Sequence, residues 1–258
     1  MLDTAKSLKG YRLQATDGTL GKVEEFYFDD KHWAVRYLVA DTGDWLTGRQ
    51  VLISPHALTA VDRQARTVSI HLTKKKIAES PSLDSDKPVS KQFEESYYVY
   101  YGWPMYWSGP FMWGAYPYLL PGPGKVREVD GRHDAWDPNL RSTRHVTGFT
   151  VVASDGEIGH VDDFVIDDET WAIRYLVVAT HNWWPGKKVL ISPRWIESIN
   201  SDHMGTMKID LSREAIKSSP EYKEAALLTR GHETALHLHY KRPEYWKEEK
   251  SVAGALRP

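Results

Sequence analysis

The chain has 258 residues, 26% of them charged, and a formal net charge of −2, so it has no global basic field to hold nucleic acid or anionic lipid. Cysteine is absent, which excludes disulfides, a thiolate nucleophile, zinc–thiolate sites and iron–sulfur clusters. No apolar run reaches the roughly 18 residues of a membrane span. The N-terminus has no apolar signal core, and we expect a cytoplasmic protein.

The strongest signal in the sequence is an internal duplication. Residues 10–55 align without a gap on residues 148–193, and half of the positions are identical. With one inserted residue the match continues to the Tyr-Trp pairs at 106–107 and 245–246. A repeat of this length can bury its own core. The chain therefore divides into a first repeat, an aromatic Gly/Pro-rich linker, a second repeat and a tail, at 1–107, 108–140, 141–247 and 248–258.

Each repeat begins with a β pattern. Asp-Gly pairs at 17–18 and 155–156 lie between apolar stretches, which is typical of a two-residue hairpin turn. Gly21 and Gly159 fall inside the strand that follows. Glycine inside a strand indicates a bulge or a tight bend, as closure of a small barrel requires.

The strand expected over residues 33–40 is apolar on both faces, broken only by Arg36. One face can fill a small barrel, and the other face needs a separate cover. Glu94 and Tyr98 begin a helical spacing that recurs in the second repeat, so a helical extension is the candidate cover. We expect a mainly β fold of two tandem small, strongly bent β-barrels with short helical extensions. The duplication also predicts a pseudo-two-fold arrangement in which the extensions bridge the repeats.

Arg36 and its counterpart Arg174 lie in apolar strands, where a buried guanidinium needs a carboxylate partner. A structural ion pair is favoured over an anion-binding site. The candidate partners are the acids that recur in the preceding hairpin, Glu25, Asp29, Asp163 and Asp167. The acidic turns themselves lack the ligand spacing of a calcium loop, and their carboxylates are better explained as turn caps.

A histidine-rich stretch near the end raises the question of a metal. It contains His232, Glu233, His237 and His239. Glu233 and His237 lie one helical turn apart, yet the first repeat has Tyr98 where the second has His237, so no duplicated metal site is predicted. No phosphate loop, dinucleotide fingerprint or Gly-x-Ser-x-Gly motif occurs, and no cofactor or catalytic residue is predicted. A Ser–His–Asp triad would need only to meet in space, and no residue recommends one.

Aromatic side chains concentrate around the linker. From residue 102 to residue 124 there is no Lys or Arg, so stacking of single-stranded nucleic acid is not favoured. Burial on the chain itself is the preferred explanation, followed by burial in an interface. The interaction candidates are Trp103, Trp107, Phe111, Trp113, Tyr116, Tyr118, Tyr245 and Trp246.

Several twice-repeated motifs resemble the PRC-barrel domain family: the Asp-Gly-x-x-Gly-x-Val hairpin, the acidic turn, the Arg-Tyr-Leu-Val strand and the Val-Leu-Ile-Ser-Pro segment. The resemblance covers residues 8–81 and 146–220. The family includes the cytoplasmic part of the photosynthetic reaction-centre H subunit and the C-terminal domain of a ribosome maturation factor. The resemblance implies a small, strongly bent β-barrel used for protein–protein contact, and it brings no shared active site.

We therefore expect a non-enzymatic protein–protein interaction or assembly module with a protein partner of unknown identity. A homo-oligomer stays open. One alternative is an RNA- or ribosome-associated maturation module, although nucleic acid is not favoured by the charge. The other is a peripheral component of a photosynthetic or other membrane complex, similar to the H subunit, attached without a transmembrane span.

Overall fold

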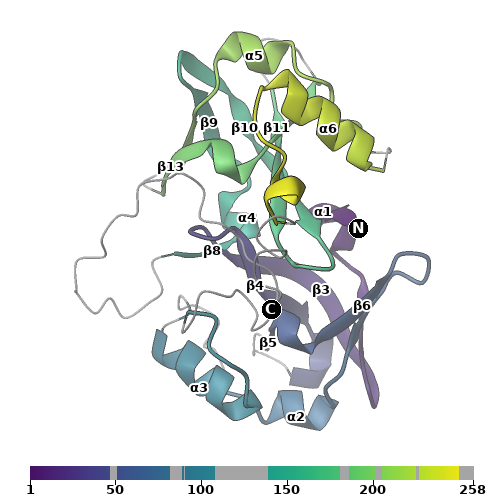
Figure 1. The fold of residues 1–258 in the computed structure, drawn as a ribbon. Helices are drawn as coiled ribbons and strands as arrows, with labels where there is room; N and C mark the ends of the chain where they lie inside the picture. Colours follow the sequence, from purple (N-terminus) through teal and green to yellow (C-terminus); the bar gives the residue numbers. More distant parts are fainter. Residues whose placement is uncertain are drawn as a thin grey trace, which may run out of the picture.

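The computed structural model describes residues 1–46, 51–81, 89, 91–107, 139–180, 186–201, 205–224 and 227–249. Figure 1 shows two β-rich repeats, one above the other, with α2 and α3 at one end of the molecule and α5 and α6 at the other. The expectation of a mainly β fold with two tandem barrel-like domains is confirmed by two seven-stranded sheets. None of the described helices is long and apolar enough to cross a membrane.

The two repeats contain the same elements in the same order. The first comprises β1 (Leu2–Thr4), α1 (Ala5–Leu8), β2 (Arg12–Ala15), β3 (Gly18–Asp29), β4 (Ala34–Asp41), β5 (Val51–Ile53), β6 (Leu58–Asp62), β7 (Thr67–Ile70), α2 (Lys74–Ala78) and α3 (Lys91–Tyr101). The second comprises β8 (Leu140–Ser142), α4 (Thr143–Val146), β9 (Thr150–Ala153), β10 (Gly156–Asp167), β11 (Ile173–Ala179), β12 (Lys188–Ile191), β13 (Ile196–Asn200), β14 (Thr206–Ile209), α5 (Arg213–Lys217) and α6 (Arg230–His239). Short 3-10 helices cover Gly43–Leu46, Pro55–Ala57 and Pro193–Trp195.

Both sheets follow one path. The first runs β5-β4-β3-β2-β7-β6 and the second runs β12-β11-β10-β9-β14-β13. Neighbouring strands are antiparallel except for the parallel pairs β2–β7 and β9–β14. Within the described residues each path has two ends, so each barrel-like sheet stays open between its first and last strands.

The predicted bulges lie where the glycines fall. The β9–β10 register shifts between Glu157 and Gly159, and the β2–β3 register shifts opposite Gly21. A Cβ atom at Gly159 would lie 2.0 Å from the carbonyl oxygen of Ala179, and one at Gly21 would lie 2.0 Å from that of Asp41. Glycine is needed at these two positions because the backbone of the next strand passes directly over them.

The central strand of each sheet is covered on both faces, as its sequence predicted. In β4, Leu38 and Ala40 join the main core, and Tyr37 and Val39 join a second cluster with residues of α3. The hydroxyl of Tyr97 in α3 donates to the carbonyl of Leu52 (2.9 Å). The extension therefore docks on its own barrel.

The expectation that the helical extensions bridge the repeats is wrong, and the N-terminal strands bridge them instead. β1 pairs antiparallel with β10 of the second repeat, from Leu2 opposite Asp167 to Thr4 opposite Val165. β8 pairs in the same way with β3 of the first repeat. The physical reason is strand length: β3 and β10 have 12 residues each, whereas β2 and β9 have 4 and leave more than half of one edge uncovered.

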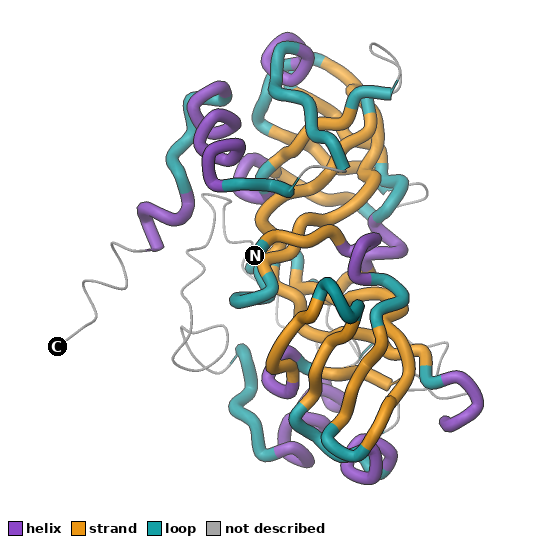
Figure 2. The backbone as a smooth tube through the Cα atoms, turned by 90° about the vertical axis from the view of Figure 1, so that its right-hand side faces the viewer, coloured by secondary structure: helices purple, strands orange, loops and turns teal. Residues whose placement is uncertain are grey.

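A second contact joins the repeats at their centre. Val35 N donates to Trp171 O (2.8 Å) and Ile173 N donates to Trp33 O (2.7 Å). Both tryptophans have positive φ angles, 54° and 57°. The exchange of equivalent groups is what a pseudo-two-fold arrangement requires. Figure 2 shows the two strand-rich bodies stacked, with the N-terminus at their junction.

The close approach at the bulge predicts a large cost for any side chain there. We expect Gly159→Ala to lower the free energy of unfolding by about 3 kcal/mol, because the strands must separate to admit a methyl group. The matched control is Gly186→Ala, which also has a positive φ (87°) but no atom within 4 Å of its Cβ position. The control should cost only about 1 kcal/mol of backbone strain. Equal losses in urea denaturation of both variants would contradict the packing argument.

The strand exchange predicts that the repeats hold together without a covalent connection. Residues 1–107 and 139–258, produced as two chains in one cell, should copurify as a one-to-one complex, because each completes the other's sheet. Size-exclusion chromatography with light scattering measures the mass. Thr143→Val should weaken this complex, because the Thr143 hydroxyl accepts from Phe26 N (3.2 Å) across the junction. Two separately folded monomers would contradict the exchange.

Candidate functional site

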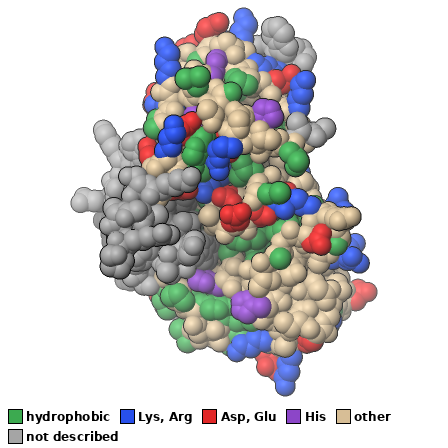
Figure 3. Space-filling view, turned by 45° about the vertical axis from the view of Figure 1, so that its right-hand side comes forward, with side chains coloured by type: hydrophobic (Ala, Val, Ile, Leu, Met, Phe, Trp, Pro, Cys, Tyr) green, Lys and Arg blue, Asp and Glu red, His purple; other side chains and the backbone are tan. Residues whose placement is uncertain are grey.

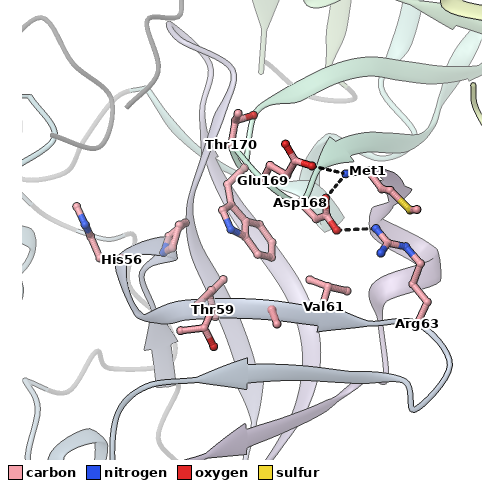
Figure 4. A pocket seen from close by; sticks show the side chains of 12 residues that line it. Met1, His56, Thr59, Val61, Arg63, Asp168, Glu169 and Thr170 are labelled. Atoms are coloured by element: carbon pink, nitrogen blue, oxygen red, sulfur yellow. Dashed lines mark hydrogen bonds and ion pairs between the residues drawn. The ribbon is translucent and has the colours of Figure 1, made fainter. Parts of the chain in front are cut away.

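A pocket of about 590 Å³ lies at the junction of the two repeats (Figure 4), and we call it the seam groove. It is formed by β6 and the 3-10 helix before it, by the turn between β10 and β11, and by the N-terminus. The residues that line it are Met1, Pro55, His56, Leu58, Thr59, Ala60, Val61, Arg63, Asp168, Glu169, Thr170 and Trp171. Figure 3 shows acidic and basic side chains gathered side by side where the repeats meet.

The wall of the groove that comes from the second repeat is a fixed aromatic ring. Trp171 is only 6% exposed, and its ring lies 6.3 Å from that of Phe26 in the first repeat. Its carbonyl is held by Val35 N at the centre of the junction. Since both repeats hold Trp171, the wall exists only when the repeats are joined.

The opposite wall is the strand β6. Leu58 and Val61 are half-buried against the core, and Thr59 and Ala60 are exposed. Within the described part of the chain, β6 pairs with β7 alone and ends its sheet. Figure 4 shows Thr59, Val61 and Arg63 along this strand, with Asp168 and Thr170 on the side of the other repeat.

One end of the groove is closed by charged residues that bind one another. Arg63 donates from Nε to Asp3 (3.0 Å) and from Nη2 to Asp168 (2.6 Å), and these hydrogen bonds raise its pKa above the ordinary value. The same Asp168 pairs with the terminal ammonium of Met1. Glu169 next to it lies 3.7 Å from the same ammonium, with 83% of its side chain exposed.

The equivalent seam in the other repeat has a different distribution of charge. There Arg141, which aligns with Asp3, pairs with Asp30 and bonds Ser201, which aligns with Arg63. The arginine of the first seam, Arg63, follows the barrel strand β6, whereas that of the second, Arg141, lies on the N-terminal strand β8. The aspartate of the turn is present in both seams. On the edge strand, Glu197 replaces Thr59. The two seams keep their geometry and differ in chemistry.

Each repeated arginine bonds an aspartate seven residues earlier. Arg36 donates to Asp29 (2.8 Å), and Arg174 donates to Asp167 (2.9 Å). The guanidinium of Arg36 also lies 3.9 Å above the ring of Tyr106. Burial by itself would raise the pKa of Asp29, but hydrogen bonding to His32 and the charge of Arg36 hold it well below the ordinary value.

The other two acids proposed as partners lie at the junction. Glu25 accepts from the hydroxyl of Ser142 and pairs with Arg144 (2.9 Å), both from the exchanged segment. Asp163 accepts from the backbone N of Lys6 (3.1 Å), and burial raises its pKa. Glu25 and Asp163 lie on the long strands four residues before Asp29 and Asp167. They therefore contact the short N-terminal helix of the other repeat, α4 or α1, rather than the arginines.

A buried glutamate clamps each helical extension to its barrel. Glu94 accepts from Tyr37 (2.9 Å) and Tyr106 (2.8 Å) through one oxygen. Glu233 accepts in the same way from the two equivalent tyrosines, Tyr175 (3.0 Å) and Tyr245 (2.7 Å). The alignment already paired these residues, but only folding brought the two tyrosines of each repeat onto one carboxylate.

The histidines of α6 have separate roles. His237 bonds the Tyr175 hydroxyl (3.0 Å) and the carbonyl of Pro243 (2.8 Å), and His239 bonds the carbonyl of Ala215 (2.8 Å). His232 joins the capping box at the start of α6. In the portion of the chain that is described, no three His, Asp or Glu side chains gather as metal ligands would.

The aromatic candidates that can be placed pack on their own repeat. Trp103 stacks on Tyr101 with ring centroids 4.4 Å apart, and Trp107 meets Tyr106 edge-on at 4.7 Å. Tyr245 is buried in the glutamate clamp, and Trp246 lies under the guanidinium of Arg230 (4.3 Å). The remaining candidates, Phe111, Trp113, Tyr116 and Tyr118, lie outside the described residues.

Sequence reasoning missed the groove residues Ala60, Val61, Arg63 and Trp171. For the residues of β6 the available signal was divergence: the stretch 56–61 differs from 194–199 in residue identity at every position, although positions 57, 58 and 61 are apolar in both copies. Trp171 is identical to its counterpart Trp33 and carried no such signal. Sequence differences between two copies of one domain, concentrated on one strand, indicate a surface where the functions of the copies differ.

The low pKa of Asp29 gives stability a defined pH dependence. Because the folded state favours the ionised carboxylate, its contribution is complete above the ordinary pKa of 3.8 and is lost as the pH falls below it. Asp29→Asn should therefore cost about 3 kcal/mol at pH 7, because it leaves the charge of Arg36 without this partner. The cost should shrink at pH 3.

Urea denaturation at the two pH values measures this difference. The control is Asp17→Asn, where an exposed carboxylate only accepts from Lys74 N at the start of α2 (2.8 Å). A cost for Asp29→Asn that is the same at both pH values would contradict the ion-pair explanation.

Comparison with known proteins agrees with the architecture. No curated protein matches the chain. The family model of the PRC-barrel domain matches residues 3–77 and 139–211, which together make up more than half of the chain and correspond to the two sheets. The chain therefore belongs to the PRC-barrel family and contains two tandem copies of its domain.

Proposed function

We propose that the protein is a non-catalytic interaction and assembly module that holds a protein partner in the seam groove. The observation that carries this proposal is that the groove takes one wall from each repeat, Val61 from the first and Trp171 from the second. Duplication of a barrel that works alone would not require such a shared site. Membership of the PRC-barrel family supports the same class of function.

The groove has the composition of a protein interface. Its walls are apolar, formed by Leu58, Val61 and Trp171, and its rim is polar, with Arg63 and Asp168 bonded to each other. An apolar centre inside a polar rim is the usual anatomy of an interface core. Fixed walls also favour binding, because little order has to be created when the partner arrives.

The polar groups of the groove support binding over catalysis and over nucleic acid. A catalytic carboxylate needs to be available to a substrate, whereas Asp168 is already bonded to Arg63. Burial and the charge of Arg36 lower the pKa of His56, which disfavours the cationic ring that would attract a phosphate. A phosphate backbone needs a continuous basic track, and the rim here alternates in sign.

A paired substitution tests the proposal with the full-length chain. Ala60→Arg places a long charged side chain in the groove, and Ser198→Arg places the same side chain at the equivalent exposed position of β13. Affinity capture from native lysate should recover a protein with the wild type and with Ser198→Arg. Recovery should fall about tenfold with Ala60→Arg, since such a blockade removes the contact energy at the centre of an interface.

Both variants should retain the wild-type melting temperature, because both positions are exposed. Recovery that is equal for all three proteins would move the interface elsewhere on the surface. Recovery abolished by ribonuclease would favour the RNA- or ribosome-associated class, and recovery of whole membrane complexes would favour the peripheral membrane class.

A further inference from the structure

The backbone of β6 presents an open edge to the seam groove. Within the described residues, the strand is hydrogen-bonded to β7 along one edge and to no strand along the other. Thr59 and Ala60 are exposed on it. An unpaired edge carries a row of N–H and C=O groups that can accept another extended chain.

This edge carries fewer of the devices that usually prevent strand addition than its counterpart does. β6 is bulged between Leu58 and Ala60, as β13 is between Ile196 and Ser198, and it ends at the charged Asp62. From Leu58 to Val61 it carries no charge and no proline, whereas the equivalent strand β13 carries Glu197 at the position of Thr59. Charged residues on an edge are the common protection against unwanted pairing. The second repeat therefore has a charge in the middle of its edge strand that the first repeat lacks.

The interface beside the groove already uses strand addition. β1 completes the edge of β10 from Leu2 to Thr4, and Asp3 of this strand bonds Arg63 at the end of β6. The groove is continuous with that junction and is lined by Met1 at one end. An extended segment in the groove would continue a mode of pairing that the molecule uses twice.

Charge and shape indicate what kind of segment fits. Arg63 and the Met1 ammonium are paired with carboxylates that outnumber them, those of Asp3, Asp168 and Glu169. Glu169 is 83% exposed, and Asp62 is exposed at the end of the strand. A basic side chain is complementary to this end. The opposite wall, Trp171, is apolar and suits an apolar side chain.

We propose that the seam groove binds an extended segment of a partner protein by strand addition to β6. One apolar side chain of the segment packs between Val61 and Trp171, and a Lys or Arg one or more positions away lies at Glu169. This inference rests on the proposed function and specifies the form of its partner.

The probe is a phage-displayed library of random peptides of about twelve residues, panned on the full-length chain, since strand addition needs only a short extended segment. Selected peptides should contain a basic residue near an apolar one. Each is then synthesised with single backbone N-methyl groups at successive positions. Strand addition predicts that affinity falls about tenfold at every second position, because only alternate amides face β6.

Variants of the protein supply the second arm. Ala60→Asp should abolish peptide binding, whereas Ser198→Asp on β13 should leave it unchanged. Glu169→Gln should weaken the basic peptides about threefold to tenfold and reduce the salt dependence of their affinity. Hydrogen exchange of the β6 amides that do not face β7 should slow when peptide binds.

The outcomes separate this inference from the proposed function. Failure to select any peptide, an N-methyl scan without alternation, or binding that survives Ala60→Asp would each overturn strand addition. A different result would keep the proposed function and overturn only strand addition. In that result Ala60→Arg abolishes capture of a folded partner, but hydrogen exchange of the β6 amides does not change when the partner binds.

Discussion

The edge of one long strand in each repeat determines the rest of this structure. β3 and β10 each extend well past the short strand beside them, and an uncovered edge in a sheet is both unstable and prone to wrong pairing. The N-terminal strand of the other repeat covers it. Because the exchange is reciprocal, neither sheet is complete without its neighbour. The two domains therefore form one structural unit rather than two independent domains joined by a linker.

The exchange also produces the candidate site. It brings the β10–β11 turn, with Asp168 and Trp171, against the edge strand of the first repeat and fixes the distance between them through Arg63. The equivalent seam uses Arg141 for the same purpose, with the donor on the other partner strand. Two copies that began with the same geometry have thus kept the junction and altered the chemistry that the junction presents.

The charged groups that recur in both repeats serve a different purpose from those that differ. Arg36 and Arg174 bond aspartates inside the fold, and Glu94 and Glu233 each hold two tyrosines under a helix. Buried polar groups of this kind are costly unless satisfied, so once established they resist change in either copy. Other seam residues differ between the copies, with Thr59 and Arg63 in the first where Glu197 and Ser201 stand in the second, which is why function is sought there.

The sequence by itself determined the duplication, because the two copies align over their whole length. It also determined the bent barrel-like sheets, the bulge glycines and the helical cover of the central strand, because each depends on a local pattern; that the sheets stay open came from the structure. It also indicated that Arg36 and Arg174 need acidic partners, but it could not choose among acids that lie close together in the chain. Only the tertiary structure decided that Glu25 and Asp163 face the other repeat, that the N-terminal strands rather than the helical extensions bridge the domains, and that a groove forms between Val61 and Trp171. These features depend on which edge a strand of three residues joins, and nothing local distinguishes its own sheet from that of its twin.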